Sequence, residues 1–144
     1  MPDDFDDLLT KATIFKDAAT KAHKDGVKRL KNLAKVLGYT GPVPQKWMCK
    51  SIPDHVAGHP NNGEIFVGEA KASQTPAACK DQINDMLKSF QKSGGKGIIA
   101  ITAPDEKAAK EWGDAVAQWM TELEPPLIPQ KQLGSGTETT HFIF

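Results

Sequence analysis

The chain has few cysteines and no long apolar run. Cys49 and Cys79 are its two cysteines, and neither stands in a CxxC pair. This excludes a disulfide framework, and we expect two reduced thiols in a cytoplasmic protein. No apolar stretch approaches the ~20 residues that span a bilayer, so we expect no contact with a membrane. Residues 1–4 are acidic at two of four positions, which differs from the basic start of a secretory signal.

The chain also lacks net charge, because 18 Lys and Arg balance 18 Asp and Glu. This balance argues against a protein that coats nucleic acid without specificity. The charge is nevertheless uneven, since residues 1–50 carry ten Lys and Arg against six Asp, a net +4 that residues 51–144 offset. The basic residues between 11 and 37 would give a helix face that meets phosphates, or a solvated face with no specific partner.

Apolar periodicity and turn residues predict a single α/β domain over residues 1–144, with no repeat and no internal linker. Gly38 is placed to end the first helix, and Gly26 is expected to bend or interrupt it. The predicted elements are a helix over about 5–37, strands over 46–52, 54–57 and 64–72, a helix over 75–92, a strand over 97–102, a helix over 104–122, and, after a loop over 125–140, a candidate edge strand over 141–144. Helices before and after a small mixed sheet predict three layers.

The strand predicted over 64–72 ends in two charged residues that share a face. Glu69 and Lys71 are two positions apart, so their side chains project together while that of Ala70 faces away. Charged groups at the end of so apolar a strand are costly unless they have partners. A site with chemistry is therefore expected at this strand end.

A turn over residues 58–63 pairs this strand with the one before it. If Ala57 opposes Glu64, then Asp54 opposes Val67 and becomes a diagonal neighbour of Glu69, at a Cβ separation of roughly 7 Å. A slip of one residue would turn Asp54 to the other face. Two carboxylates so close repel each other and favour a hard cation, Mg²⁺ or Mn²⁺.

Such a site has the parts that phosphodiester hydrolysis needs. A divalent cation polarises a phosphoryl oxygen and lowers the pKa of a bound water. Lys71, beside it, would orient or deprotonate that water and stabilise the negative charge that develops on the phosphate.

Pro53-Asp54, followed fifteen residues after the aspartate by Glu69-Ala70-Lys71, resembles the PD-(D/E)xK signature of the restriction-endonuclease-like nucleases. The resemblance covers residues from about 5 to 102. It implies the three-layer core of that family, with its helix, three-stranded meander, helix and further strand. It also implies that Asp54, Glu69 and the carbonyl of Ala70 hold the metal and that Lys71 is catalytic.

Other candidates lie around this motif. Ser73 follows it directly and would contact a phosphate, or would simply precede the next helix. Gln82 lies in the predicted helix after the motif, where several branches of this nuclease family place a functional Gln. By this resemblance, we expect Gln82 to contact the substrate. Members of that family also take an acidic residue or a His from the first helix, for which this chain offers Asp17, His23 and Asp25.

A second match to the motif is a decoy. Pro104-Asp105-Glu106-Lys107 also contains DxK, but it begins a predicted helix, where residues two apart do not share a face. His55 and His59 flank the turn, but their spacing with the cysteines fits no common zinc site, so we expect ordinary loop histidines.

Three functions remain open on the sequence. The resemblance favours a small DNA endonuclease that selects structure or reads sequence only weakly. A homodimer of such an enzyme would cut both strands. An RNA-cleaving toxin or effector domain would use the same chemistry. A non-catalytic nucleic-acid or protein-binding module would keep the fold, although it has no need for paired acids near bound phosphates.

Overall fold

The computed structural model describes residues 20–71, 75–134 and 136–144. Within these ranges, five strands form one mixed sheet in the order β1-β2-β3-β5-β4. Strands β2 and β3 are parallel, and the other neighbouring strands are antiparallel. The strands are β1 (His55–Gly58), β2 (Ile65–Ala70), β3 (Gly97–Thr102), β4 (Lys131–Leu133) and β5 (Thr139–Ile143).

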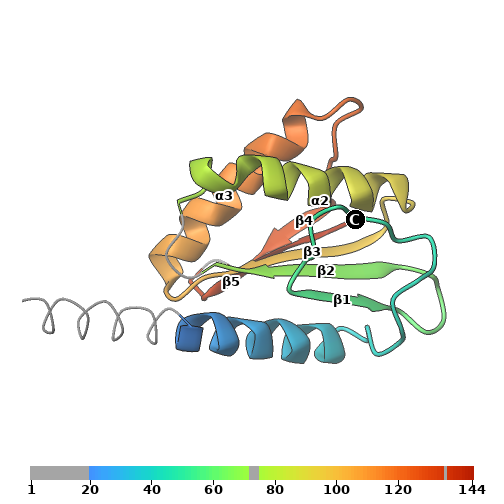
Figure 1. Ribbon diagram of the computed structural model, residues 1–144, viewed down its shortest axis with the longest axis horizontal. Coiled ribbons are helices and arrows are strands. Elements are labelled where there is room, and N and C mark those ends of the chain that lie inside the picture. The colour runs from blue at the N-terminus through green and yellow to red at the C-terminus, as the bar shows by residue number, and fades with distance from the viewer. Residues whose placement is uncertain (1–19, 72–74, 135) are drawn as a thin grey trace, which may run out of the picture.

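Helices cover both faces of the sheet and produce three layers (Figure 1). One face carries the helix over residues 20–36, called the N-terminal helix below. The other face carries α2 (Lys80–Lys92) and α3 (Glu106–Glu122), and the 3-10 turn η1 (Ala77–Cys79) precedes α2. The predicted α/β class is therefore confirmed. No helix in the described ranges is long and apolar enough to cross a membrane.

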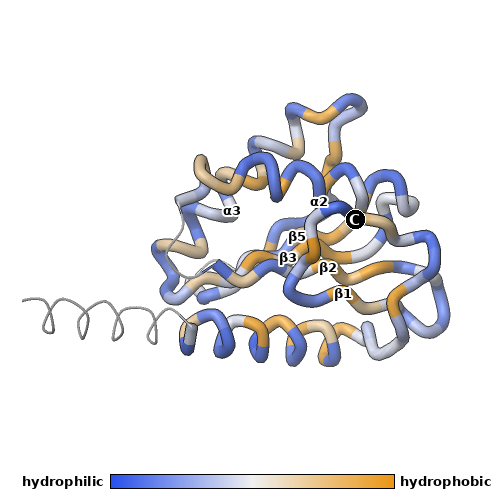
Figure 2. Tube along the Cα trace, in the orientation of Figure 1, coloured by the Kyte–Doolittle hydropathy of each residue, from blue (hydrophilic) through white to orange (hydrophobic). Residues whose placement is uncertain are grey.

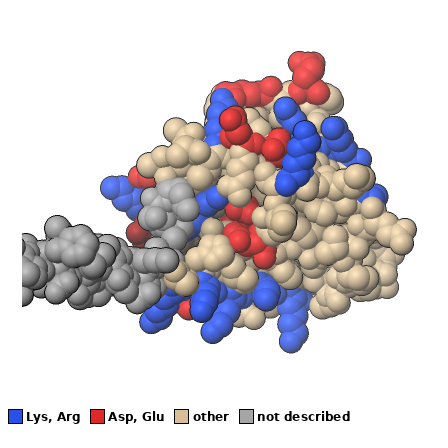
Figure 3. All heavy atoms as spheres, in the orientation of Figure 1, with Lys and Arg blue, Asp and Glu red and all other residues tan. Residues whose placement is uncertain are grey.

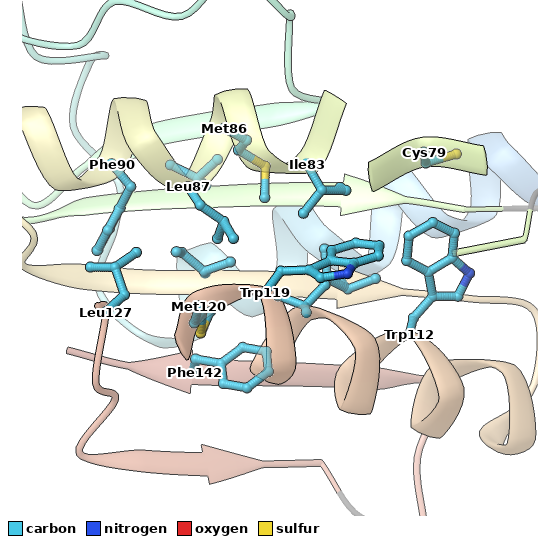
Figure 4. Close-up of a cluster of buried hydrophobic side chains, with 14 of the residues drawn as sticks. Cys79, Ile83, Met86, Leu87, Phe90, Trp112, Trp119, Met120, Leu127 and Phe142 are labelled. Carbon is cyan, nitrogen blue, oxygen red and sulfur yellow. The ribbon is translucent and has the colours of Figure 1, made fainter. Parts of the chain in front are cut away.

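The sheet separates two hydrophobic clusters. The larger cluster lies between the sheet and helices α2 and α3, and includes Trp112, Trp119 and Phe142 (Figure 4). The smaller cluster lies beneath the N-terminal helix and includes Leu30 and Phe66. All six residues of β2 and of β3 are buried because both faces of the central strands are covered. Figure 2 shows these strands as hydrophobic segments in the middle of the molecule.

The N-terminal helix ends at a glycine, as predicted. Gly38 has a φ of +92°, and its N–H donates to the carbonyl of Lys35 while that of Tyr39 donates to the carbonyl of Ala34. Gly26 does not interrupt the helix, which runs through it. A Cβ on Gly26 would lie 2.9 Å from the Cβ of Ala70, so glycine here permits close packing of helix on sheet.

The strand predicted over 46–52 is wrong, because this segment is a loop. Pro44 and Pro53 have no N–H to donate, and a turn closes where Trp47 N–H donates to the carbonyl of Pro44. The outer edge of β1 instead meets Gly41, in an isolated bridge to Gly58. Two strands, not three, therefore precede α2 in the described chain.

The end of the chain differs from the prediction as well. The proposed loop over 125–140 contains β4, and β5 begins at Thr139 and lies between β3 and β4, so β4 is the edge strand. Gly134, with a φ of +110°, helps the chain turn back from β4 to β5. The glycines that indicated a loop are thus the turn of a hairpin.

Candidate active site

Glu69 and Lys71 lie where β2 ends, on the face that α2 and α3 cover. Ile65 and Val67, which are in phase with Glu69 along the strand, belong to the cluster beneath those helices. Glu69 is 3% exposed and Lys71 is 7% exposed. The structure thus brings the acid and the amine together in a nearly dry environment, where each needs a partner.

Lys71 is held by groups from three elements. Its Nζ lies 3.2 Å from Oε2 of Glu69 and donates to Oε1 of Gln82, on α2, at 2.9 Å. The ammonium also lies 5.6 Å from the centroid of the Trp112 ring, on α3. The sequence predicts that Gln82 contacts the substrate. In the structure its side chain contacts Lys71.

Asp54 joins this pair through two hydrogen bonds. Its N–H donates to Oε1 of Glu69 at 3.0 Å, and its Oδ2 accepts from the N–H of Ala70 at 2.8 Å. Side chain and backbone thus link the start of β1 to the end of β2 in both directions. Asp54, Glu69 and Lys71 form one connected group.

The hairpin register differs by two residues from the one predicted. Ala57 opposes Phe66, not Glu64, and continuing this register places Asp54 opposite Glu69. β1 ends at Gly58 and β2 begins at Ile65, each one residue later than predicted, and the side chain of Asn62 accepts from the N–H of Glu64 within the turn. A shift of two is one full period of a strand, so the expected face is retained.

The N-terminal helix contributes His23, whose Nε2 lies 2.9 Å from Oδ1 of Asp54. Of the three candidates on the first predicted helix, His23 is therefore the one that meets the site, while Asp25 is exposed and Asp17 lies outside the described residues. Gly26, three positions after His23, was the available signal, because a helical glycine marks a close approach to another backbone.

Burial raises the pKa of the Glu69 carboxyl above its ordinary value, and the negative charge of Asp54 raises it further. The ammonium of Lys71 and the N–H of Asp54 act in the opposite direction but do not outweigh these effects. The carboxyl of Glu69 therefore holds its proton more tightly than a free glutamate does.

All four carboxylate oxygens of Asp54 and Glu69 have a protein partner. Oδ2 of Asp54 and Oε1 of Glu69 accept from backbone N–H groups, while Oδ1 of Asp54 faces His23 and Oε2 of Glu69 faces Lys71. In the described residues, no three His, Cys, Asp or Glu side chains are already arranged around a common metal position. Two carboxylates and the carbonyl of Ala70 are nevertheless the oxygen donors that Mg²⁺ and Mn²⁺ prefer.

The remaining candidate residues lie outside the Asp54, Glu69 and Lys71 group or outside the described residues. Ser73 lies outside the described residues. Asp105 caps α3, where its side chain accepts from the N–H of Ala108, so the second DxK match is a helix start. His59 packs edge-on against Tyr39. Arg29, which the sequence did not single out, binds Oγ1 of Thr102, the carbonyl of Ala103 and the carboxylate of Glu138, and so ties the N-terminal helix to the sheet.

Comparisons of the chain with models of known protein families, with curated proteins and with solved structures find no match.

Proposed function

We propose that this chain is a divalent-metal-dependent nuclease that hydrolyses phosphodiester bonds in DNA. The observation that carries the proposal is the convergence of Asp54, Glu69 and Lys71, through contacts of 3.0 Å and 3.2 Å, at the end of a buried strand. Structural ion pairs are usually placed where water screens them, whereas this one is buried beside a second acid. A buried carboxyl whose pKa is raised, as that of Glu69 is, and which contacts a second acid and an amine is typical of reactive sites.

The architecture supports membership of the restriction-endonuclease-like nucleases. The motif stands on a hairpin, and α2 then crosses to the parallel strand β3 while the N-terminal helix covers the opposite face (Figure 1). The chain departs from the family pattern before β1, where a loop with a single bridge at Gly41 replaces a strand.

Each residue has a distinct role in this proposal. The carboxylates of Asp54 and Glu69 and the carbonyl of Ala70 would hold the metal. When bound, Mg²⁺ would supply charge neutralisation of the phosphate and a more acidic water. Lys71 positions the attacking water and stabilises the charge that develops on the phosphate, and Gln82 fixes the direction of its ammonium.

The test is to supply the purified protein with Mg²⁺ or Mn²⁺ and with supercoiled plasmid, single-stranded DNA, a four-way junction or RNA. We expect DNA cleavage that requires the metal and is lost in Asp54→Asn, Glu69→Gln and Lys71→Met. These near-isosteric changes leave little cavity, and circular dichroism checks the fold of each.

The decoy motif offers matched controls. Asp105→Asn retains a good helix cap, and Lys107→Met removes an exposed lysine, so both variants should cut like the wild type. Calorimetry should detect Mg²⁺ binding to the wild type and not to Asp54→Asn. A wild type that binds no divalent metal, or site variants that still cut, would refute the proposal. Cleavage of RNA alone would identify a ribonuclease.

A further inference from the structure

A hollow of about 550 Å³ opens beside Asp54, between the loop over 41–53 and the start of β1. Ten residues line it: Val43, Trp47, Met48, Cys49, Ser51, Ile52, Pro53, Asp54, His55 and Val56. Its volume lies in the range of small-ligand sites, roughly 300–1,000 Å³. Because Asp54 is part of its wall, anything bound here lies next to the proposed reaction centre.

Three exposed apolar side chains gather at the wall of the hollow. Met48 is 81% exposed and Ile52 is 88% exposed, and Val43 is also exposed. Half of the six exposed large hydrophobic residues in the described chain therefore line this one hollow. Exposed apolar residues gathered in one place indicate a binding surface.

The same loop carries exposed positive charge. Lys46 and Lys50 are exposed and lie close in sequence to Trp47, Met48 and Ile52. Basic groups that follow a backbone, interleaved with flat or apolar side chains that receive bases, are the pattern of single-strand nucleic-acid sites.

A row of lysines on the N-terminal helix extends this charge. Lys21, Lys24, Lys28, Lys31 and Lys35 are all exposed, and their alternate spacings of three and four place them along one stripe. Figure 3 shows the blue side chains along the edge of the molecule where this helix lies.

The row and the hollow are neighbours. Asp54 lines the hollow, and its Oδ1 lies 2.9 Å from Nε2 of His23, which stands between Lys21 and Lys24 on the N-terminal helix. The other side of the helix, with Arg29, faces β3 and the segment before β5. The stripe therefore lies on the β1 side of the sheet, beside the hollow.

We propose that the hollow receives an unpaired base of single-stranded DNA whose backbone follows the lysine row and whose next phosphate reaches Asp54. The inference rests on the proposed nuclease function and specifies its substrate, which is DNA with a single-stranded segment rather than an intact duplex. A base within a duplex is stacked and paired and cannot enter the hollow without being extruded.

Fluorescence anisotropy tests whether the chain prefers single-stranded DNA. The full chain is used in EDTA, which removes divalent metal so that binding is measured without cleavage. The probes are labelled oligothymidylate, oligouridylate, a blunt duplex and the same duplex with a single-stranded extension. We expect the oligothymidylate and the extended duplex to bind at least about fivefold tighter than the blunt duplex, and Met48→Ser/Ile52→Ser to abolish that difference. Val36→Ser/Ile128→Ser removes two equally exposed apolar side chains elsewhere and should change nothing.

The lysine row is tested with its own variant and a matched control variant. Lys24→Gln/Lys28→Gln/Lys31→Gln should weaken oligothymidylate binding and reduce the slope of log K against log salt by about 2. Lys88→Gln/Lys92→Gln/Lys96→Gln makes the same change of charge on exposed lysines of α2 and the turn after it, and should retain the wild-type slope.

The outcomes separate this inference from the function on which it rests. Equal binding of blunt duplex and single strand, or a preference for oligouridylate, would overturn the inference even if metal-dependent cleavage of DNA is found. A Met48→Ser/Ile52→Ser variant that changes from dimer to monomer in light scattering, with its DNA binding intact, would assign the hollow to a second copy and also overturn it. Single-strand binding without any cleavage would support the inference and count against the nuclease.

Discussion

His23 and Asp54 are 31 residues apart in the chain, yet Nε2 of the imidazole lies 2.9 Å from Oδ1 of the carboxylate. With the N–H of Ala70 on Oδ2, both oxygens of Asp54 have a partner and the plane of the carboxylate is fixed. A helix on one side of the sheet thus orients an acid of the site, which also contacts Glu69 on the other side.

The first prediction concerns His23→Ala. We expect Mg²⁺ affinity to fall about tenfold, because groups that orient a metal ligand typically contribute 10- to 100-fold to affinity or activity. The midpoint of thermal unfolding should hardly change, because the side chain is 45% exposed. Calorimetry and a melting curve measure the two effects. Unchanged metal affinity would show that the contact with Asp54 has no bearing on the cation.

A second prediction concerns Gly26→Ala. The added Cβ would lie 2.9 Å from the Cβ of Ala70 and 3.2 Å from Cγ2 of Thr102, so the helix has to move away from the sheet. The crowding should cost about 1–3 kcal/mol, more than the roughly 1 kcal/mol that alanine gains in helix propensity. Urea unfolding should therefore show a net loss of stability. Asn32→Ala, at an exposed position of the same helix, should be neutral or slightly stabilising.

The central strands and their helices could be predicted from the sequence because local patterns determine them. The run Gly97–Thr102 is apolar up to its last residue, and the stripe from Cys79 to Phe90 has helical spacing, so each pattern alone identifies its element. The pairing of Glu69 with Lys71 is also local, since two residues are one period of a strand.

Features that depend on distant segments were harder to predict. The loop over 46–52 alternates like a strand, but β1 offers it no continuous edge, because Gly41 meets Gly58 there. The choice of His23 over Asp25 depends on where the helix touches the sheet, which Gly26 determines through its contact with Ala70. Gly26 marks the face of the helix that touches the sheet, but its partner Ala70 lies in a different segment, so the helix sequence alone does not show which residue of the sheet His23 meets.

The third prediction is a pH dependence that arises from Glu69. Because the folded state raises the pKa of this carboxyl, its contribution to stability is complete below the ordinary pKa and is lost as the pH rises through the raised value. Glu69→Gln has no such proton. The free energy of unfolding of the wild type minus that of the variant should therefore decrease as the pH rises through the acid range.

Magnesium should reverse this trend, since it requires the ionised carboxylate. We expect the affinity of the wild type for Mg²⁺ to weaken on acidification, and binding to release protons, which calorimetry in buffers of different ionisation enthalpy detects. Urea unfolding at a series of pH values, with and without Mg²⁺, measures the two directions. A stability difference that increases with pH in the absence of metal would contradict the buried, proton-retaining state of Glu69.

The last prediction separates the lysine from the metal ligands. Gln82 touches Nζ of Lys71 at 2.9 Å, whereas the acids are held by other groups, so Gln82→Leu should misdirect the ammonium without altering the carboxylates. We expect the rate of cleavage with saturating DNA to fall about tenfold while the Kd for Mg²⁺ stays within about twofold. Gln82→Glu keeps an acceptor in place and should recover most of the rate. A parallel loss of rate and metal affinity in Gln82→Leu would mean that Gln82 acts through the acids, and that Lys71 is a partner of Glu69 rather than a catalytic group.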